Sequence, residues 1–126
     1  MAPSSSALLL EDQFKTLCSA LGALAATWRG SDVTRSRLAA AASVLVDHVA
    51  LHVATLQVIP YSRDVARTTR DALLATRALL TALDRAGREG TTPELRRAAL
   101  GARRLLDALT PVSEVAIEWS EDLLRN

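Results

Sequence analysis

The chain has 126 residues, of which 49% are hydrophobic and only 3% aromatic, and 15 basic residues are set against 14 acidic ones. A net charge of +1 gives no overall electrostatic reason to expect nucleic-acid or membrane partners. Sparse Gly and Pro, with a core built from Leu, Ala and Val, are typical of packed helices joined by short turns. The composition therefore predicts one all-α domain over residues 1–126.

The first helix is predicted over residues 7–28, after an N-cap in Ser4-Ser5-Ser6. Its large apolar residues follow a 4-3-4-3-4 spacing: Leu10, Phe14, Leu17, Leu21, Leu24 and Trp28. This spacing places them in one seam along the helix. Gly30 breaks the helix and Ser31-Asp32 begins the next, so the first two helices should form an antiparallel hairpin.

Residues 38–59 are the most apolar stretch of the chain, and Pro60 ends it. We expect a helix that is apolar on nearly all sides to be covered by its neighbours, as the central helix of a bundle. Its core face is predicted to hold Leu38, Ala42, Leu45, Val49, His52, Leu56 and Ile59. Although 22 residues could span a bilayer, Asp47, His48 and His52 lie near the middle, so we expect no membrane insertion.

The third helix is predicted from residue 61 to about residue 86, before the Gly87–Gly90 stop. Its core face should contain Val65, Thr69, Ala72, Leu73, Thr76, Leu79, Leu80 and Leu83. The fourth begins at Thr92-Pro93-Glu94, an N-cap followed by Pro and an acid. Its buried side is predicted as Leu95, Ala98, Ala99, Ala102, Leu105, Leu106 and Leu109.

Thr110-Pro111 repeats that start signal, which predicts a break or a kink there and a short fifth helix over residues 112–124. The predicted architecture is an antiparallel bundle of four long helices plus a shorter C-terminal fifth helix. A single cysteine, Cys18, excludes an intrachain disulfide. The N-terminus lacks the basic and apolar regions of a secretion signal, so we expect a cytoplasmic protein, or a nuclear one if the cell has a nucleus.

Two histidines, His48 and His52, are spaced i,i+4 and could together ligate a metal or cofactor. The chain contains no third histidine, and only Cys18 and distant carboxylates could complete a site. The alternative is that His52 is a core-edge residue satisfied by one hydrogen bond and that His48 lies at the boundary of the core. We expect no cofactor, and keep a metal- or cofactor-binding bundle as the alternative function.

Arg96, Arg97, Arg103 and Arg104 recur at a seven-residue interval and predict a basic stripe on the fourth helix. Such a stripe could meet phosphates or an acidic partner, or it could be a solvated face partly paired by Arg103 and Asp107. Because the chain is so poor in aromatic residues, stacking on nucleic-acid bases is not expected. No phosphate-binding loop or nucleophile motif is present, which predicts a non-enzymatic protein.

The order of features over residues 35–110 resembles a known family. A long apolar helix ends at Pro60, a Leu/Ala-rich helix ends at Gly87–Gly90, and a new helix opens with Thr92-Pro93-Glu94-Leu95-Arg96-Arg97 and continues through Gly101-Ala102. This order resembles the N-terminal helical bundle of the Grap and cyclin-D-interacting protein family. The resemblance implies an adaptor that binds helical proteins such as cell-cycle or helix-loop-helix regulators. The chain has no counterpart of that family's acidic linker and second helical half, so the partner's identity is not carried over.

The sequence thus predicts a protein-interaction module that recognises another helical protein, or a second copy of itself as a homodimer. Several apolar residues fall outside the predicted core faces: Val44, Leu51, Val58, Leu74 and Ile117. We expect Val44 and Leu51 to form an apolar strip flanked by the Arg stripe, which would orient the partner.

Overall fold

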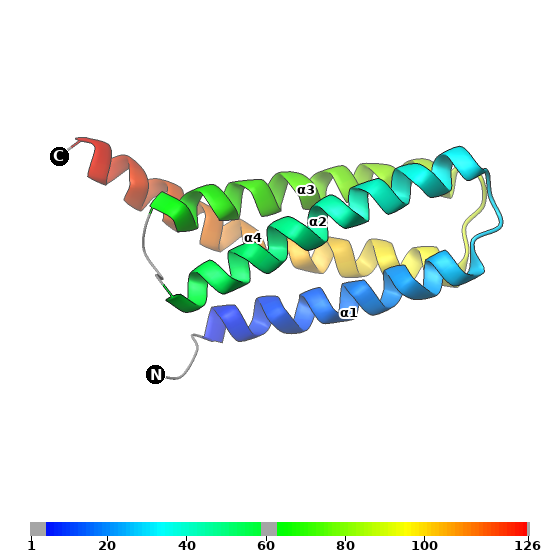
Figure 1. Cartoon of the computed structure of the whole chain (residues 1–126), viewed down its shortest axis with the longest axis horizontal. Coiled ribbons are helices and arrows are strands. Elements are labelled where there is room, and N and C mark those ends of the chain that lie inside the picture. The colour runs from blue at the N-terminus through cyan, green and yellow to red at the C-terminus, as the bar shows by residue number, and fades with distance from the viewer. Residues whose placement is uncertain (1–4, 59–62, 126) are drawn as a thin grey trace.

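The computed structural model describes the backbone of residues 5–58 and 63–125, and the side chains of residues 9–55, 65 and 67–109. Over that part of the chain there are no strands, and the helices are α1 (Ser5–Thr27), α2 (Asp32–Val58), α3 (Arg63–Gly87) and α4 (Pro93–Arg125). Figure 1 shows them running alternately in opposite directions, with the α1–α2 and α3–α4 turns side by side at one end of the bundle. The prediction of an all-α bundle of four long helices is confirmed.

The four helices pack as a ring. α2 lies along α3, α3 along α4 and α4 along α1, whereas α1 and α2 touch more sparingly. Within the described part of the chain, no Cα atom of α2 lies within 8 Å of one in α4, so these two helices occupy diagonal positions in the bundle. This diagonal placement decides which surface residues can act together.

The seam of α1 is confirmed. Leu10, Leu17 and Leu24 are buried, while Phe14, Leu21 and Trp28 pack against the same core from its edge. Each fully buried Leu contributes about 1.5–3 kcal/mol of favourable transfer free energy. The spacing works because residues three and four apart fall on one side of a helix.

The predicted core faces of α3 and α4 are also confirmed. On α3, Val65, Thr69, Ala72, Thr76, Leu79 and Leu83 are buried. On α4, Leu95, Ala98, Ala102, Leu105 and Leu109 are buried. Leu73, Leu80, Ala99 and Leu106 are half-buried beside them. Thr92 caps α4, because its hydroxyl oxygen accepts a 3.2 Å hydrogen bond from the Leu95 N–H.

The prediction of a separate fifth helix after Thr110-Pro111 is wrong. α4 continues through both residues to Arg125, so there is no separate fifth helix, and in Figure 1 the end of α4 extends beyond the other helices. A proline removes one backbone N–H from the helical ladder, and here the helix continues past it. A start signal in the sequence is therefore not sufficient to end a long helix.

The prediction that α2 is covered on most sides is also wrong. One face of α2 is buried, and it holds Leu38, Leu45, Val49 and His52 as predicted. The outer side is open to solvent: Val33 is 61% exposed, Val44 49%, Val46 37% and Leu51 57%. Alanine explains the difference, because the many Ala residues of α2 raise its apolar content while exposing little apolar area each.

The apolar residues that fall outside the predicted core faces are exposed wherever the structure describes their side chains. Val44, Leu51 and Leu74 are exposed, and Leu74 retains 54% of its accessible surface. Val58 and Ile117, and the predicted core positions Leu56 and Ile59, fall outside the described side chains.

Candidate protein-interaction surface

The outer side of α4 carries a basic surface with an apolar centre. Arg96, Arg97, Arg103 and Arg104 are all exposed, and Leu100 between them is 50% exposed. These five residues, which we term the α4 basic surface, follow an i, i+1, i+4, i+7, i+8 spacing that turns them away from the buried face of the helix. The predicted Arg stripe is therefore exposed, and Leu100 is the residue that the sequence interpretation missed.

Two shallow grooves flank this surface. The groove between α1 and α4, about 540 Å³ in volume, is lined by Arg97 and Arg104 together with the small residues Ala20, Ala23 and Gly101. The groove between α3 and α4, about 530 Å³, is lined by Arg96 and Arg103. Leu100 lines both grooves, so it forms an apolar ridge with a pair of guanidinium groups on each side.

α1 and α4 approach each other closely at Gly101. A Cβ atom placed on Gly101 would lie 3.4 Å from Cδ1 and 3.5 Å from Cα of Leu17. A methyl group at this buried position would be in ordinary van der Waals contact with Leu17, and Gly101 itself lines the α1–α4 groove.

The four guanidinium groups have no ion-pair partner among the residues that the structure describes. The alternative in which Arg103 pairs with Asp107 is not found in the structure, although both side chains are exposed on the same helix. An exposed i,i+4 pair stabilises a helix by only about 0.3–0.5 kcal/mol, which does not compel two mobile side chains to meet. None of the described acidic side chains therefore neutralises the charges of the α4 basic surface.

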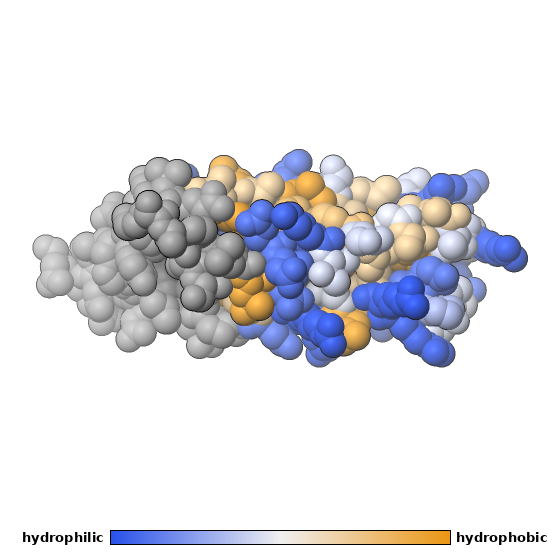
Figure 2. All heavy atoms as spheres, turned by 90° about the horizontal axis from the view of Figure 1, so that it is seen from below, coloured by the Kyte–Doolittle hydropathy of each residue, from blue (hydrophilic) through white to orange (hydrophobic). Residues whose placement is uncertain are grey.

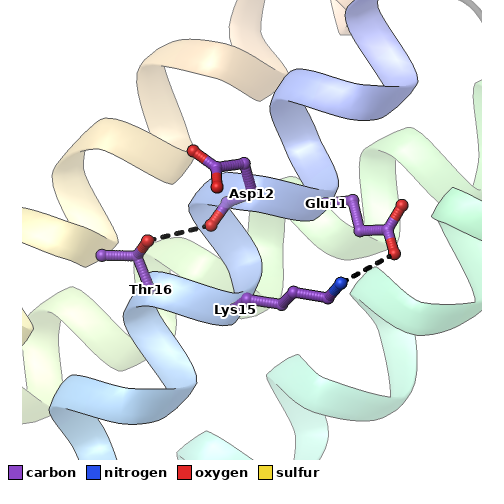
Figure 3. A network of polar contacts seen from close by, with 4 residues as sticks. All are labelled: Glu11, Asp12, Lys15 and Thr16. Carbon is purple, nitrogen blue, oxygen red and sulfur yellow. Dashed lines mark hydrogen bonds and ion pairs between the residues drawn. The ribbon is translucent and has the colours of Figure 1, made fainter.

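Lys15, on the α1 wall of the first groove, is engaged within its own helix. Its Nζ lies 3.3 Å from Oε1 of Glu11, while the Thr16 hydroxyl donates to the backbone carbonyl of Asp12 at 3.0 Å (Figure 3). These contacts run along α1, one turn back toward its N-terminus. The cationic character of the groove consequently comes from Arg97 and Arg104 on α4.

The predicted combination of Arg residues with Val44 and Leu51 is not brought together. Val44 and Leu51 are exposed on α2, which lies diagonally across the bundle from α4. Figure 2 shows apolar atoms along much of the upper edge of the molecule, whereas hydrophilic atoms predominate along the lower edge of the described part. The bundle thus has two separate candidate surfaces, one basic and one apolar.

His52 is a buried polar residue rather than an open ligand. Its Nδ1 lies 2.9 Å from Oγ1 of Thr68, and Oγ1 of Thr69 lies 3.4 Å from both ring nitrogens. The Thr68 hydroxyl donates to the carbonyl of Val65 at 3.2 Å, and the direction of its hydrogen bond with Nδ1 of His52 depends on the tautomer of the ring. The hydrogen-bonded interpretation of His52 is confirmed, with the ring fully inside the core rather than at its edge.

Burial lowers the pKa of the His52 imidazole to about 4, because the surrounding core disfavours the charged ring. His48 is half-buried one turn earlier. In the described part of the chain, no group of three His, Cys, Asp or Glu residues could hold a metal ion. Among the described side chains, the His48/His52 alternative therefore has no third ligand. Cys18 is also half-buried, and burial raises the pKa of its thiol.

Comparison of the chain with protein-family models, curated proteins and solved structures finds no match. The resemblance to the Grap and cyclin-D-interacting protein family stays a prediction.

By length and composition, Asp32–Thr55 of α2 could cross a membrane, and only 22% of its most apolar window is buried. The exposed side of α2 therefore calls for an explanation of its own.

Proposed function

We propose that this protein is a non-catalytic interaction module that recognises a helical partner through the α4 basic surface. One observation carries the proposal: four exposed guanidinium groups without partners in the described chain flank the exposed Leu100 in two pairs. An apolar side chain loses water on binding and supplies affinity, while the surrounding charges set orientation and association rate. We place its action in the cytosol or nucleus.

The chemistry of the surface specifies the partner. An amphipathic helix laid across Leu100 would need an apolar residue over the ridge and Asp or Glu residues above each pair of guanidinium groups. Small residues on the floor of the α1–α4 groove leave room for side chains of that helix. Arg offers a planar, bidentate fit to a carboxylate, so charge pairing also fixes the register.

A nucleic acid fits this surface less well. Its phosphates could meet the guanidinium groups, but among the described side chains no aromatic residue lines either groove to stack on a base. Leu100 would also lie against the polar sugar-phosphate backbone, to which its side chain can offer no hydrogen bond. The mixture of Leu and Arg supports a protein partner.

The test compares quantitative affinity capture from native lysate by three forms of the chain. In the Arg97→Glu/Arg103→Glu variant, each groove presents a reversed charge. The Arg77→Glu/Arg85→Glu variant carries the same change of net charge on exposed positions of α3 and serves as the control. We expect a helical, acidic protein to be retained by the wild type and the control, and to be lost from the α4 variant.

Purified partner should then bind the wild type at least about tenfold more tightly than the α4 variant, with an affinity that falls as salt is added. A Leu100→Ser variant should weaken binding without changing that salt dependence. Equal capture by the α4 variant and the control would refute the proposal, as would recovery of nucleic acid in place of protein.

A further inference from the structure

The outer face of α2 carries a second seam that the bundle does not use. Its residues are spaced 4-3-4-3-4 and are all exposed: Val33, Arg37, Ala40, Val44, Asp47 and Leu51. This is the spacing of a coiled-coil seam. It lies apart from the buried face of the same helix, where Leu38, Leu45, Val49 and His52 meet the core. We term these six residues the α2 outer seam.

The α2 outer seam is complementary to the same seam of a second copy that runs in the opposite direction. When a second α2 is laid against it in the opposite direction, centred near residue 42, Leu51 of one copy meets Val33 of the other. Asp47 then meets Arg37, and Val44 meets Ala40. A two-fold axis repeats each pairing, so the interface contains two ion pairs and four apolar contacts. Every seam position has a matching partner.

Charge selects this orientation. Arg37 and Asp47 are exposed, and neither has an ion-pair partner among the described residues. In a parallel pair of helices Arg37 would meet Arg37 and Asp47 would meet Asp47, which is repulsive in both layers. A polar pair inside an apolar seam is a known device for fixing register and orientation.

The residues beside the seam allow close approach. Ser36, Ser43 and Ala50, which follow one another at intervals of seven, are small and exposed along one flank. The seam from Val33 to Leu51 is about 27 Å long at the rise of an α-helix. No bulky charged side chain on that flank would hold a second helix away.

We propose that two copies of this chain associate through the α2 outer seam as an antiparallel, two-fold symmetric homodimer. Because α4 is diagonal to α2, both α4 basic surfaces stay open and lie on opposite sides of the dimer. The dimer is then bivalent, and it can hold two partner helices or bind one repetitive partner with increased avidity.

A charge-reversal exchange tests the pairing of Arg37 with Asp47. Arg37→Asp and Asp47→Arg each place like charges opposite one another in both layers, so we expect each variant to be monomeric by sedimentation and native mass spectrometry. Mixed in equal amounts, the two variants restore both ion pairs, and we expect a dimer containing one copy of each. Arg85→Asp, an exposed change on α3, should dimerise like the wild type.

Circular dichroism and thermal melting on all forms confirm that the exposed substitutions leave the fold intact. A wild type that stays monomeric at about 100 µM would overturn the proposal, since even a weak dimer of this kind is populated there. Dimers that form equally well in both single variants, or a mixture that stays monomeric, would also overturn it. Binding of monomeric protein to zwitterionic vesicles would instead assign the apolar face to a membrane.

The proposed dimer and the proposed partner site can be refuted separately. The Arg97→Glu/Arg103→Glu variant should dimerise like the wild type, and the Arg37→Asp variant should still bind the acidic helix as a monomer. Loss of dimerisation in the α4 variant would place the contact on α4 and refute the α2 assignment.

Discussion

The backbone N–H of Ser31 donates a 2.8 Å hydrogen bond to Oε1 of Glu89, fastening the α1–α2 turn to the α3–α4 turn. Ser31 also caps α2, because its hydroxyl oxygen accepts a 3.2 Å hydrogen bond from the Thr34 N–H. Its carbonyl accepts a 3.1 Å hydrogen bond from the Trp28 indole. One residue therefore joins both turns at this end of the bundle.

Removing the Glu89 carboxylate should loosen that end. Hydrogen bonds from the Thr34 hydroxyl, the Ser31 backbone and the Ser31 hydroxyl hold the pKa of the Glu89 carboxyl below its usual value. The folded state thus favours the ionised form, and this stabilisation is complete above the ordinary pKa and is lost as pH falls through the lowered one. We expect faster hydrogen exchange at the Ser31 amide in Glu89→Ala and an intermediate rate in Glu89→Gln. Arg88→Ala, in the same turn, is the control, and unchanged exchange in Glu89→Ala would contradict the link.

The stability of the protein should fall between pH 6.5 and pH 4 because of His52. The unfolded imidazole has an ordinary pKa of 6.5 and the buried one a pKa of about 4, so across this window the unfolded state binds more protons. The contribution of neutral His52 to the free energy of unfolding is fully present above pH 6.5, and by pH 4 up to about 3 kcal/mol of stability is lost. Urea unfolding across this range should show the slope in the wild type.

His52→Leu should remove most of that slope, because it removes the titrating imidazole. The variant should still fold, since the hydroxyl groups of Thr68 and Thr69 still donate to the carbonyl of Val65. His48→Gln is the matched control, one helical turn away, and it should keep the wild-type slope. If His52→Leu titrates like the wild type, the acid sensitivity arises elsewhere.

Three glycines should respond to alanine in three different ways. Gly22 lies inside α1 with open space around it, so Gly22→Ala should stabilise the fold by about 0.5–1 kcal/mol through helix propensity. Gly101→Ala places its methyl group in ordinary contact with Leu17 and should gain less. At Gly30 a methyl group would overlap the Trp28 indole, with Cε2 and Cη2 each 2.8 Å away. That ring is held by its hydrogen bond to Ser31, so Gly30→Ala should destabilise.

Thermal or urea unfolding of the three variants orders them directly. A larger substitution, Gly101→Val, should be destabilising, because the backbone of Leu17 beside it cannot move without separating α1 from α4. A stabilising Gly30→Ala would show that the indole is free to leave its position.

The regular helices were predictable because their apolar residues repeat with the period of a helix. Leu10, Leu17 and Leu24 mark a single side of α1, and the same logic located the core faces of α3 and α4. α2 lacks such contrast: alanine and valine occur on every side, so the pattern cannot show which sides have neighbours. Its covered face was inferred correctly, whereas the cover expected on its outer face depends on packing that the pattern does not contain.

The site was predictable in part for a related reason. The exposure of the four arginines could be predicted because they point to a different side of α4 from its buried face, which includes Leu95 and Leu105. Leu100 carries a usable signal, since it is the one large apolar residue between the two arginine pairs. The grouping of those arginines with Val44 and Leu51 was avoidable, because four antiparallel helices with short turns place the second and fourth diagonally.

Two leucines on α2 separate a buried face from an exposed one. Leu45 is fully buried, so Leu45→Ala should lower the free energy of unfolding by about 2–5 kcal/mol. Leu51 is 57% exposed, and Leu51→Ala should change the stability of the monomer by no more than about 0.5 kcal/mol. Urea unfolding at low protein concentration isolates this intrinsic term, because dimerisation would otherwise add stability to the wild type. At high concentration Leu51→Ala should weaken the dimer. Equal losses at Leu45 and Leu51 in dilute protein would mean that the outer face of α2 is covered after all.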